Sequence, residues 1–321
     1  MYKRQKLNVC VKNNQLIKNI PLMTTKNTVV SSNSETGTLY IVATPIGNLG
    51  DITQRAIETL KKVDKICAED TRNTRKLLTH FGIQGDLQAL HDHNETNRIE
   101  QIKGWLDSGE NIALVSDAGT PLISDPGYHL VNVLGGLSDV DNQQTYKIEP
   151  IPGVSAIVTA LSIAGLPTDR FTFEGFLPAK SSGRNKALEA NVLETRTQVY
   201  YESSHRIDHT IQAMFEIYGA ERKVVLAREL TKLYEQIFRG NLAELNEWIN
   251  ADPMHQKGEF VLMIEGHQEQ TDLDEIEASS KQLLSILLDE LPVKQSASIA
   301  AKITGRKKNE LYRLAMELKK A

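Results

Sequence analysis

Cysteine is scarce in this sequence of 321 residues, which contains only Cys10 and Cys67. Two cysteines exclude a disulfide-rich scaffold and a Cys-rich zinc site, and they suit a reducing compartment. Long apolar runs are also missing, so the sequence predicts no transmembrane helix. The basic residues near the start are not followed by an apolar segment, so we expect no secretory signal. These absences together favour a cytoplasmic protein.

Acidic charge dominates only the middle of the chain. The formal net charge is −4, but residues 1–36 carry six Lys or Arg and one acidic residue, a balance of +5. Residues 293–321 carry eight Lys or Arg and two acidic residues, a balance of +6, which leaves −15 on the residues between. Two basic ends could contact a polyanion such as a nucleic acid, although short basic tails are more often only solvated. Charge alone leaves both interpretations open.

Short apolar runs alternate with helical patterns from Thr38 onward, beginning with a strand pattern at 39–43. Alternation of this kind with short connections predicts a parallel sheet covered by helices on both faces. Further strands are expected at 65–69, 87–90, 112–116 and 147–150. The first helix is expected to follow a cap at Asp51, and the next helices are expected at 71–81, 96–106 and 128–134.

A second α/β pattern begins after the Pro152-Gly153 boundary. Its strands are expected at 171–177, 198–202, 223–227, 234–239 and 259–265, and its helices at 156–164, 186–193, 207–218 and 242–249. Two consecutive strands imply a hairpin, so this sheet should be mixed. Three helices are then expected at 276–290, 296–303 and 307–319, with Gly305 separating the last two as in a helix-turn-helix.

The predicted architecture is therefore α/β, with a parallel-sheet domain, a mixed-sheet domain and a small C-terminal helical module. The expected boundaries are a disordered extension over 1–36, α/β domains over 37–150 and 151–268, and a basic helical module over 272–321. The polar segment 135–145 is interpreted as a surface insertion, and Met23 is an alternative start.

Four loops rich in Gly, Pro and small polar residues follow predicted strands, where an open parallel sheet binds its ligands. They cover 44–50, 69–75, 116–126 and 151–156. The first, TPIGNLG, is neither a GxGxxG fingerprint nor a Walker loop, which argues against NAD and ATP. A plain turn between a strand and a helix explains the same loop equally well.

Charged groups gather in the second of these loops, where Glu69, Asp70 and Arg72 follow a strand. Their structural alternative is a helix N-cap with a surface ion pair.

Weaker candidates for chemistry lie elsewhere in the chain. Ser204 and His205 form a conceivable nucleophile pair, although neighbours in sequence rarely point at each other correctly. His91 and His93 are a weak metal pattern.

Six motifs in order carry a resemblance to a known family. They are TPIGNLGDIT (44–53), AEDTRNTRKLL (68–78), SDAGTPLISDPG (116–127), IPGVSA (151–156), EGFLPAK (174–180) and YESSHR (201–206). The sequence over 37–268, together with the helical tail, resembles the tetrapyrrole-methylase superfamily, and within it the branch that acts on ribosomal RNA. TPIGN stands where the superfamily has GxGPG, which fits that branch and counts against a corrinoid or haem-precursor substrate.

The resemblance implies an S-adenosylmethionine-dependent methyltransferase with its cofactor between two α/β domains. It implies 2′-O-methylation of a cytidine ribose in the decoding region of 16S rRNA in the small ribosomal subunit, by a homodimer. The family's cofactor loops fall on Thr44, Pro45, Gly47, Asn48, Asp117, Ala118, Gly119, Thr120, Pro152, Gly153, Ser155 and Ala156.

A ribose hydroxyl is a poor nucleophile, so a nearby carboxylate would help to remove its proton. We expect Asp70 or Glu69 to assist the hydroxyl and Arg72 to contact an rRNA phosphate, and the reaction requires no metal.

The basic tail is a candidate RNA anchor, with a solvated helix face or a dimer strut as the alternative. Its cations are Lys302, Arg306, Lys307, Lys308, Arg313, Lys319 and Lys320. Three other functions stay open: a small-molecule methyltransferase of the same fold, a non-catalytic rRNA-binding protein, and a Ser–His hydrolase.

Overall fold

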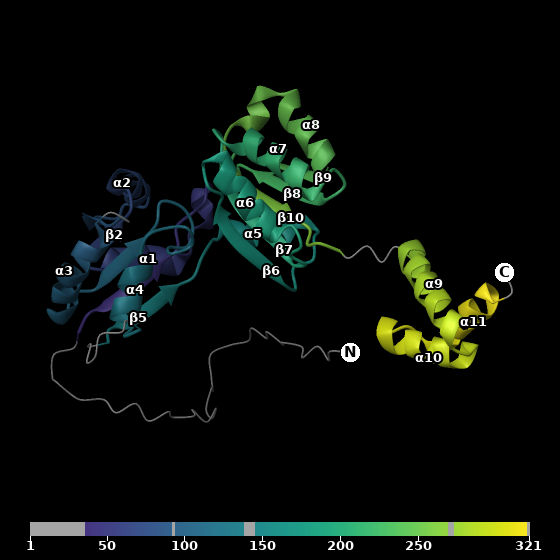
Figure 1. Ribbon diagram of the computed structural model, residues 1–321. Coiled ribbons are helices and arrows are strands. Elements are labelled where there is room, and N and C mark those ends of the chain that lie inside the picture. Colours follow the sequence, from purple (N-terminus) through teal and green to yellow (C-terminus); the bar gives the residue numbers. More distant parts are fainter. Residues whose placement is uncertain (1–35, 92–93, 138–144, 269–272, 320–321) are drawn as a thin grey trace, which may run out of the picture. The chain divides into compact units, whose positions relative to one another are not determined.

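The computed structural model describes residues 36–91, 94–137, 145–268 and 273–319 (Figure 1). Most of the predicted N-terminal extension, the centre of the predicted insertion, His93 and Lys320 lie outside these residues. Within the described part of the chain, no helix has the length and apolar character needed to cross a membrane.

The first domain contains a sheet of five parallel strands in the order β3-β2-β4-β1-β5. Its strands are β1 (Thr38–Val42), β2 (Lys65–Ala68), β3 (Asp86–Ala89), β4 (Ile112–Val115) and β5 (Lys147–Ile151). Its helices are α1 (Gln54–Lys62), α2 (Thr71–His80), α3 (Glu95–Asp107) and α4 (Tyr128–Leu134). Each predicted strand forms within one or two residues of its expected bounds.

Both faces of this sheet are buried, because the central strands are apolar on both sides. One face packs against α3 and α4 through Ile102, Leu106 and Leu130. The opposite face packs against α1 and α2 through Leu60 and Leu78. Continuous apolar runs such as Ile112–Val115 are typical of parallel strands covered on both faces.

The start of the first helix differs from the prediction. Thr53, not Asp51, caps α1, since its hydroxyl accepts the Ala56 N–H at 3.1 Å. Asp51 instead ends a short 3₁₀ turn, η1 (Leu49–Asp51), whose cap is Asn48. Because Asp51 belongs to this turn, the helix begins two residues later than predicted, after Thr53.

The second domain contains a mixed sheet in the order β6-β7-β10-β8-β9. Strand β6 is parallel to β7, and the other neighbours are antiparallel, including the predicted β8–β9 hairpin. The strands are β6 (Phe171–Phe176), β7 (Thr197–Ser203), β8 (Lys223–Arg228), β9 (Gln236–Asn241) and β10 (Glu259–Ile264). The helices are α5 (Ala156–Ala164), α6 (Ser181–Asn191), α7 (Ile207–Tyr218), α8 (Leu242–Ala251) and the short η2 (Pro253–Gln256).

Alternate residues of β8 enter different cores. Val224 and Leu226 belong to the core under α6, α7 and α8, whereas Val225 and Ala227 belong to the core under α5. This alternation follows from the two-residue period of a strand. The second sheet therefore has helices on both faces as well (Figure 1).

The C-terminal module has its own core. It comprises α9 (Leu273–Glu290), α10 (Val293–Thr304) and α11 (Lys308–Leu318), and its buried side chains are Leu284, Ala297, Ala300, Leu311 and Ala315. Gly305 adopts a φ of 71° after α10, a left-handed conformation that favours glycine and ends a helix. The predicted break between the last two helices is therefore confirmed.

The order of the first sheet places its ligand-binding edge between β4 and β1. After β1 the chain passes through α1 on one face to β2, and after β4 it passes through α4 on the other face to β5. The loops that leave these neighbouring strands therefore diverge and open a crevice at their carboxyl ends.

Candidate functional site

The two loops at this crevice are joined by backbone hydrogen bonds. The Thr44 N–H donates to the Gly119 carbonyl at 2.8 Å, and the Gly119 N–H donates back at 3.1 Å. The Thr44 hydroxyl is buried and donates to the Ser116 carbonyl at 3.2 Å. Gly119 has a φ of 87°, which a side chain would strain. The loops of the first and third sequence motifs are therefore held together by hydrogen bonds.

A third loop is attached to this unit. The Thr120 hydroxyl donates to the Val154 carbonyl at 2.9 Å, which brings the segment 151–156 beside it. Gly153 passes close to the first loop, since a Cβ at this position would lie 2.9 Å from the Cβ of Ala43. The structure thus brings together three of the loops that the sequence singled out.

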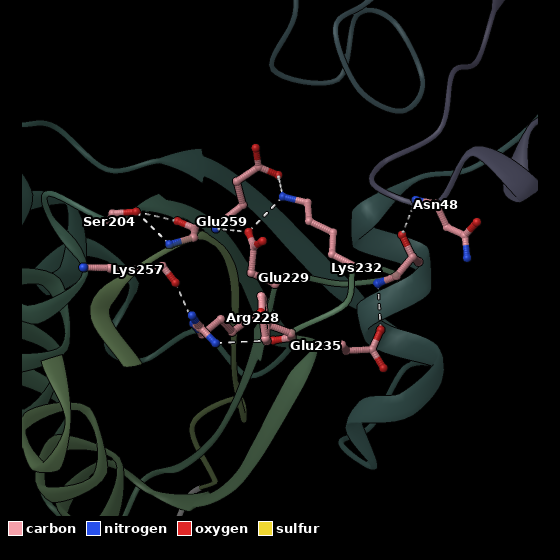
Figure 2. Close-up of polar contacts among 11 residues, drawn as sticks. Asn48, Ser204, Arg228, Glu229, Lys232, Glu235, Lys257 and Glu259 are labelled. Atoms are coloured by element: carbon pink, nitrogen blue, oxygen red, sulfur yellow. Dashed lines mark hydrogen bonds and ion pairs between the residues drawn. The ribbon is translucent and has the colours of Figure 1, made fainter. Parts of the chain in front are cut away.

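The loop between β8 and β9, residues 229–235, belongs to the second domain and contacts the first loop (Figure 2). The Asn48 N–H donates to the Thr231 hydroxyl at 3.1 Å. Gly47 faces the same segment, because a Cβ there would lie 2.5 Å from Lys232 Cγ and 3.0 Å from the Leu230 carbonyl oxygen. Ile46 packs in the core under α5. Three consecutive residues of the first loop, Ile46, Gly47 and Asn48, therefore contact the second domain.

A lysine between two carboxylates holds the β8–β9 loop in shape. Lys232 Nζ lies 2.8 Å from Glu229 Oε1 and 2.9 Å from Glu259 Oε2 (Figure 2). Burial opposes ionisation of Glu229, but the hydrogen bonds from Lys232 and from the Glu259 N–H prevail and lower its pKa. Glu229 and Thr231 have φ values of 51° and 65°, conformations that cost about 1–3 kcal/mol each in a residue other than glycine.

A cavity of about 560 Å³ is lined by residues of both α/β domains. Its polar lining includes the carboxyl residues Glu69, Asp117 and Glu202, and its aromatic lining includes Phe176 and Tyr201. Burial raises the pKa of Tyr201 to about 12, so its hydroxyl stays neutral. We call this the first cavity.

A second cavity of about 310 Å³ adjoins the first. It is bounded by the first loop, by Asn73, Lys76 and Leu77 of α2, and by Lys232. Four residues line both cavities: Ile46, Asp117, Ala118 and Glu259. The Asp117 carboxylate accepts the Asp70 N–H at 3.1 Å and the Asn73 amide at 3.0 Å. Asp117, which lies between the two cavities, is therefore held in place by the first turn of α2.

The predicted cofactor residues divide between the two cavities. The first cavity is lined by Asp117, Ala118, Gly119, Thr120, Ser155 and Ala156, and the second by Thr44, Pro45, Gly47, Asp117 and Ala118. Asn48 lines neither cavity; its side chain accepts the Gly50 N–H at 2.9 Å. Pro152 and Gly153 also lie outside both linings.

The three candidate catalytic residues have different surroundings. Glu69 lines the first cavity, whereas Asp70 and Arg72 line neither. The Asp70 carboxylate caps α2 and accepts two hydrogen bonds from the Arg72 guanidinium, at 2.7 and 3.1 Å. These bonds lower the pKa of Asp70 to about 2. Asp70 and Arg72 are therefore an ion pair at the start of the helix.

The Ser204 hydroxyl is already engaged in the structure. It donates to the Gly258 carbonyl at 2.8 Å and accepts the Gly258 N–H at 2.9 Å (Figure 2). A hydroxyl whose proton is directed at a carbonyl is not poised for activation by His205. The geometry thus opposes a Ser–His hydrolase.

The described part of the chain holds no group of three His, Cys, Asp or Glu residues able to bind a metal.

Sequence reasoning did not identify Asn73, Tyr201, Lys232 or Glu259 as site residues. Asn73 and Tyr201 lie inside quoted motifs, so the motifs themselves contained a signal for them. Lys232 and Glu259 lie outside every motif. Only the folded chain brings them to the first loop.

Comparison with known proteins agrees with this architecture. A family model for Tetrapyrrole (Corrin/Porphyrin) Methylases matches residues 38–246, and a model for the RsmI C-terminal HTH domain matches residues 274–319. The crystal structure of a diphthine synthase superposes with a TM-score of 0.55 at 15% identity, over 72% of this chain and 90% of that one. This likeness shows a shared fold.

Relatives with higher identity span nearly the whole chain. Ribosomal RNA small subunit methyltransferase I from Escherichia coli O157:H7 is 51% identical over 89% of this chain and 97% of its own length. The protein of the same name from Pasteurella multocida is 50% identical over 89% of this chain and 99% of its own length. The chain therefore belongs to the tetrapyrrole methylase family, within the group of ribosomal RNA small subunit methyltransferase I proteins.

Proposed function

We propose that this chain transfers a methyl group from S-adenosylmethionine to the ribose 2′-hydroxyl of a cytidine in the decoding region of 16S rRNA. The observation that carries this proposal is the pair of adjoining cavities with a common wall. A transfer between two substrates needs a donor site and an acceptor site whose reacting atoms meet in line. The names of the relatives support a small-subunit rRNA as the acceptor.

The first cavity fits S-adenosylmethionine by size and by chemistry. Its aromatic side chains offer apolar contact for a nucleoside, and its carboxyl groups suit the amino and sulfonium charges. The loops 116–120 and 151–156 contribute small residues whose backbone groups can approach the ligand. When bound, the cofactor supplies an electrophilic methyl carbon.

The side chains where the two cavities meet then position the acceptor and remove its proton. We assign the role of the base that takes this proton to Glu69, because it lines the cavity that holds the methyl donor. Asp70 positions α2 through its cap and its pairing with Arg72. Asp117, held by α2 through Asn73, forms the wall past which the two substrates meet.

The assay that tests this function supplies labelled S-adenosylmethionine to small ribosomal subunits that lack the modification. The expected result is label on one cytidine, whose ribose then resists alkaline cleavage. Label on a base, or no label, would contradict the proposal. Transfer to a free tetrapyrrole but not to subunits would identify the small-molecule alternative, and subunit binding without cofactor binding would identify a non-catalytic protein.

We also propose that the enzyme acts as a homodimer in the cytoplasm, where its substrate subunits are assembled. Exposed apolar side chains on α5 and β6, Val158 and Phe171, are available to a second copy. Light scattering after size-exclusion chromatography should give twice the 35.8 kDa chain mass. A monomer at micromolar concentration would exclude the dimer.

A further inference from the structure

We propose that the second cavity receives the target nucleoside and that Arg75 and Lys76 of α2 bind a phosphate beside it. The partner is thus a single-stranded segment of RNA, seated with one nucleotide turned into the protein. This inference rests on the proposed function, because it names the place where that function's acceptor substrate binds.

The exposed side of α2 carries uncompensated positive charge. Thr74 and Leu78 face the core, while Arg72, Arg75, Lys76 and Thr79 lie on the exposed side at helical spacing. Arg72 is neutralised by Asp70. Within the described residues, neither Arg75 nor Lys76 lies within 4.0 Å of a carboxylate, and Lys76 Nζ contacts a neutral amide, Asn73 Oδ1, at 3.4 Å.

This basic side borders the second cavity directly. Lys76 and Asn73 line the cavity, and Arg75 precedes Lys76 on the exposed side of the same helix. A nucleoside in the cavity would have its flanking phosphate near its mouth, where a cation gains most from a charge-assisted contact. The chain between its basic ends, α2 included, has a balance of −15, so RNA must be held at local basic sites such as this one.

The position of the cavity suits an acceptor site. It shares Asp117 and Ala118 with the first cavity, so a hydroxyl in one lies beside a methyl donor in the other. This open cavity is bounded by residues of three loops, of α2 and of β10, so a nucleotide has to leave its stack to lie among them. Enzymes that modify such positions take the nucleotide out of the stack.

The test uses the full chain with Arg75→Ala, Lys76→Ala and the double variant. Lys76→Arg keeps the charge, and Lys61→Ala with Lys62→Ala on α1 removes two exposed charges from the same domain outside both cavity linings. Circular dichroism and thermal unfolding confirm that each variant is folded. The probes are unmethylated small subunits, an unmodified 16S rRNA fragment of the decoding region, and S-adenosylmethionine by calorimetry.

Each alanine substitution should weaken subunit binding about three- to fivefold near physiological salt and reduce the slope of log affinity against log salt by about 0.7. The double variant should show both losses, and Lys76→Arg and the α1 variants should retain the wild-type slope. Affinity for S-adenosylmethionine should not change. The rRNA fragment should respond as the subunit does.

Wild-type slope and affinity in the double variant would overturn this inference, even if the wild-type enzyme methylates subunits normally. Weaker binding to subunits with unchanged binding to the rRNA fragment would overturn it too, because the surface would then contact a ribosomal protein. A failure of the proposed function gives a different result, because the wild-type enzyme itself would then transfer no methyl group to subunits.

Discussion

Glu69 and Asp70 are neighbours in sequence, yet the backbone places them in different surroundings. Glu69 ends the strand side of the loop and lines the first cavity. Asp70 begins the helix, accepts the Arg72 N–H at 2.8 Å and pairs with the Arg72 guanidinium. A carboxylate that is held ionised by an arginine is a weak base. We therefore expect different roles for the two residues, because one lines the cavity and the other caps the helix.

Glu69→Gln should lower kcat by about a hundredfold or more, the lower range for loss of a positioned base. Asp70→Asn should have a much smaller effect, since asparagine also caps a helix. Single-turnover methyl transfer at saturating cofactor measures both, and calorimetry controls for cofactor affinity. A larger loss in Asp70→Asn than in Glu69→Gln would reverse this assignment.

Arg72→Ala should raise the pKa of Asp70 from about 2 towards its ordinary value. Because the folded-state pKa is lowered, the pair stabilises the folded protein above the unfolded-state pKa of about 4 and loses this contribution as pH falls towards 2. The variant should therefore lose stability less steeply over this acid range. Carbon-13 NMR titration of the aspartate carboxyls measures the pKa, and an unchanged value would contradict the pairing.

At the scale of elements, the β8–β9 loop is the feature with the widest consequences. It extends from the hairpin of the second sheet and holds the first loop through Thr231. Its own shape depends on Lys232 between Glu229 and Glu259. The close approach of this loop requires glycine at position 47, because a side chain there would meet Lys232 and Leu230. The backbone angle is not the reason, since the φ of Gly47 is outside the left-handed region.

Gly47→Ala should destabilise the protein by about 1–3 kcal/mol, the usual cost of overpacking, and raise KM for the substrates. Gly104→Ala is the matched control: this glycine lies inside α3, and a Cβ there meets nothing within 4 Å. Helix propensity predicts that the control gains about 0.5–1 kcal/mol. Urea unfolding measures both variants, and equal effects would show that the β8–β9 loop does not press on Gly47.

At the scale of the whole molecule, the basic C-terminal module combines structural and exposed cations. Arg306 donates to the Ser280 hydroxyl at 3.2 Å and lies 3.9 Å from Glu310, so it joins the helices of the module. Lys302, Lys307, Lys308, Arg313 and Lys319 are exposed. The exposed residues are therefore the better candidates for an RNA anchor, and Arg306 is a better candidate for stability.

Lys308→Ala with Arg313→Ala should weaken subunit binding and reduce its salt dependence without changing thermal unfolding. Arg306→Ala should instead lower the unfolding temperature of the module, since it leaves Ser280 and Glu310 without this contact. Deleting residues 272–321 should weaken subunit binding further and leave cofactor affinity intact. Unchanged subunit affinity after the deletion would exclude the module as an anchor.

The sequence alone predicted the alternation of strands and helices in both α/β domains, including α4, α5 and α7 with the observed bounds. This was possible because burial on one or two faces leaves a local period in the residues that form each element. Caps were harder to predict: Thr53 and Asp51 are both good capping residues, and only the 3₁₀ turn before the helix decides between them.

The tertiary structure decided how the motifs are combined. Asn48 and Thr231 are 183 positions apart, and no local pattern records that one donates to the other. The strand order determined which loops share the crevice, and it placed α2 beside a second cavity. The sequence determined which elements form because their causes are local. Only folding determined which residues form the site, because its causes are contacts between distant segments.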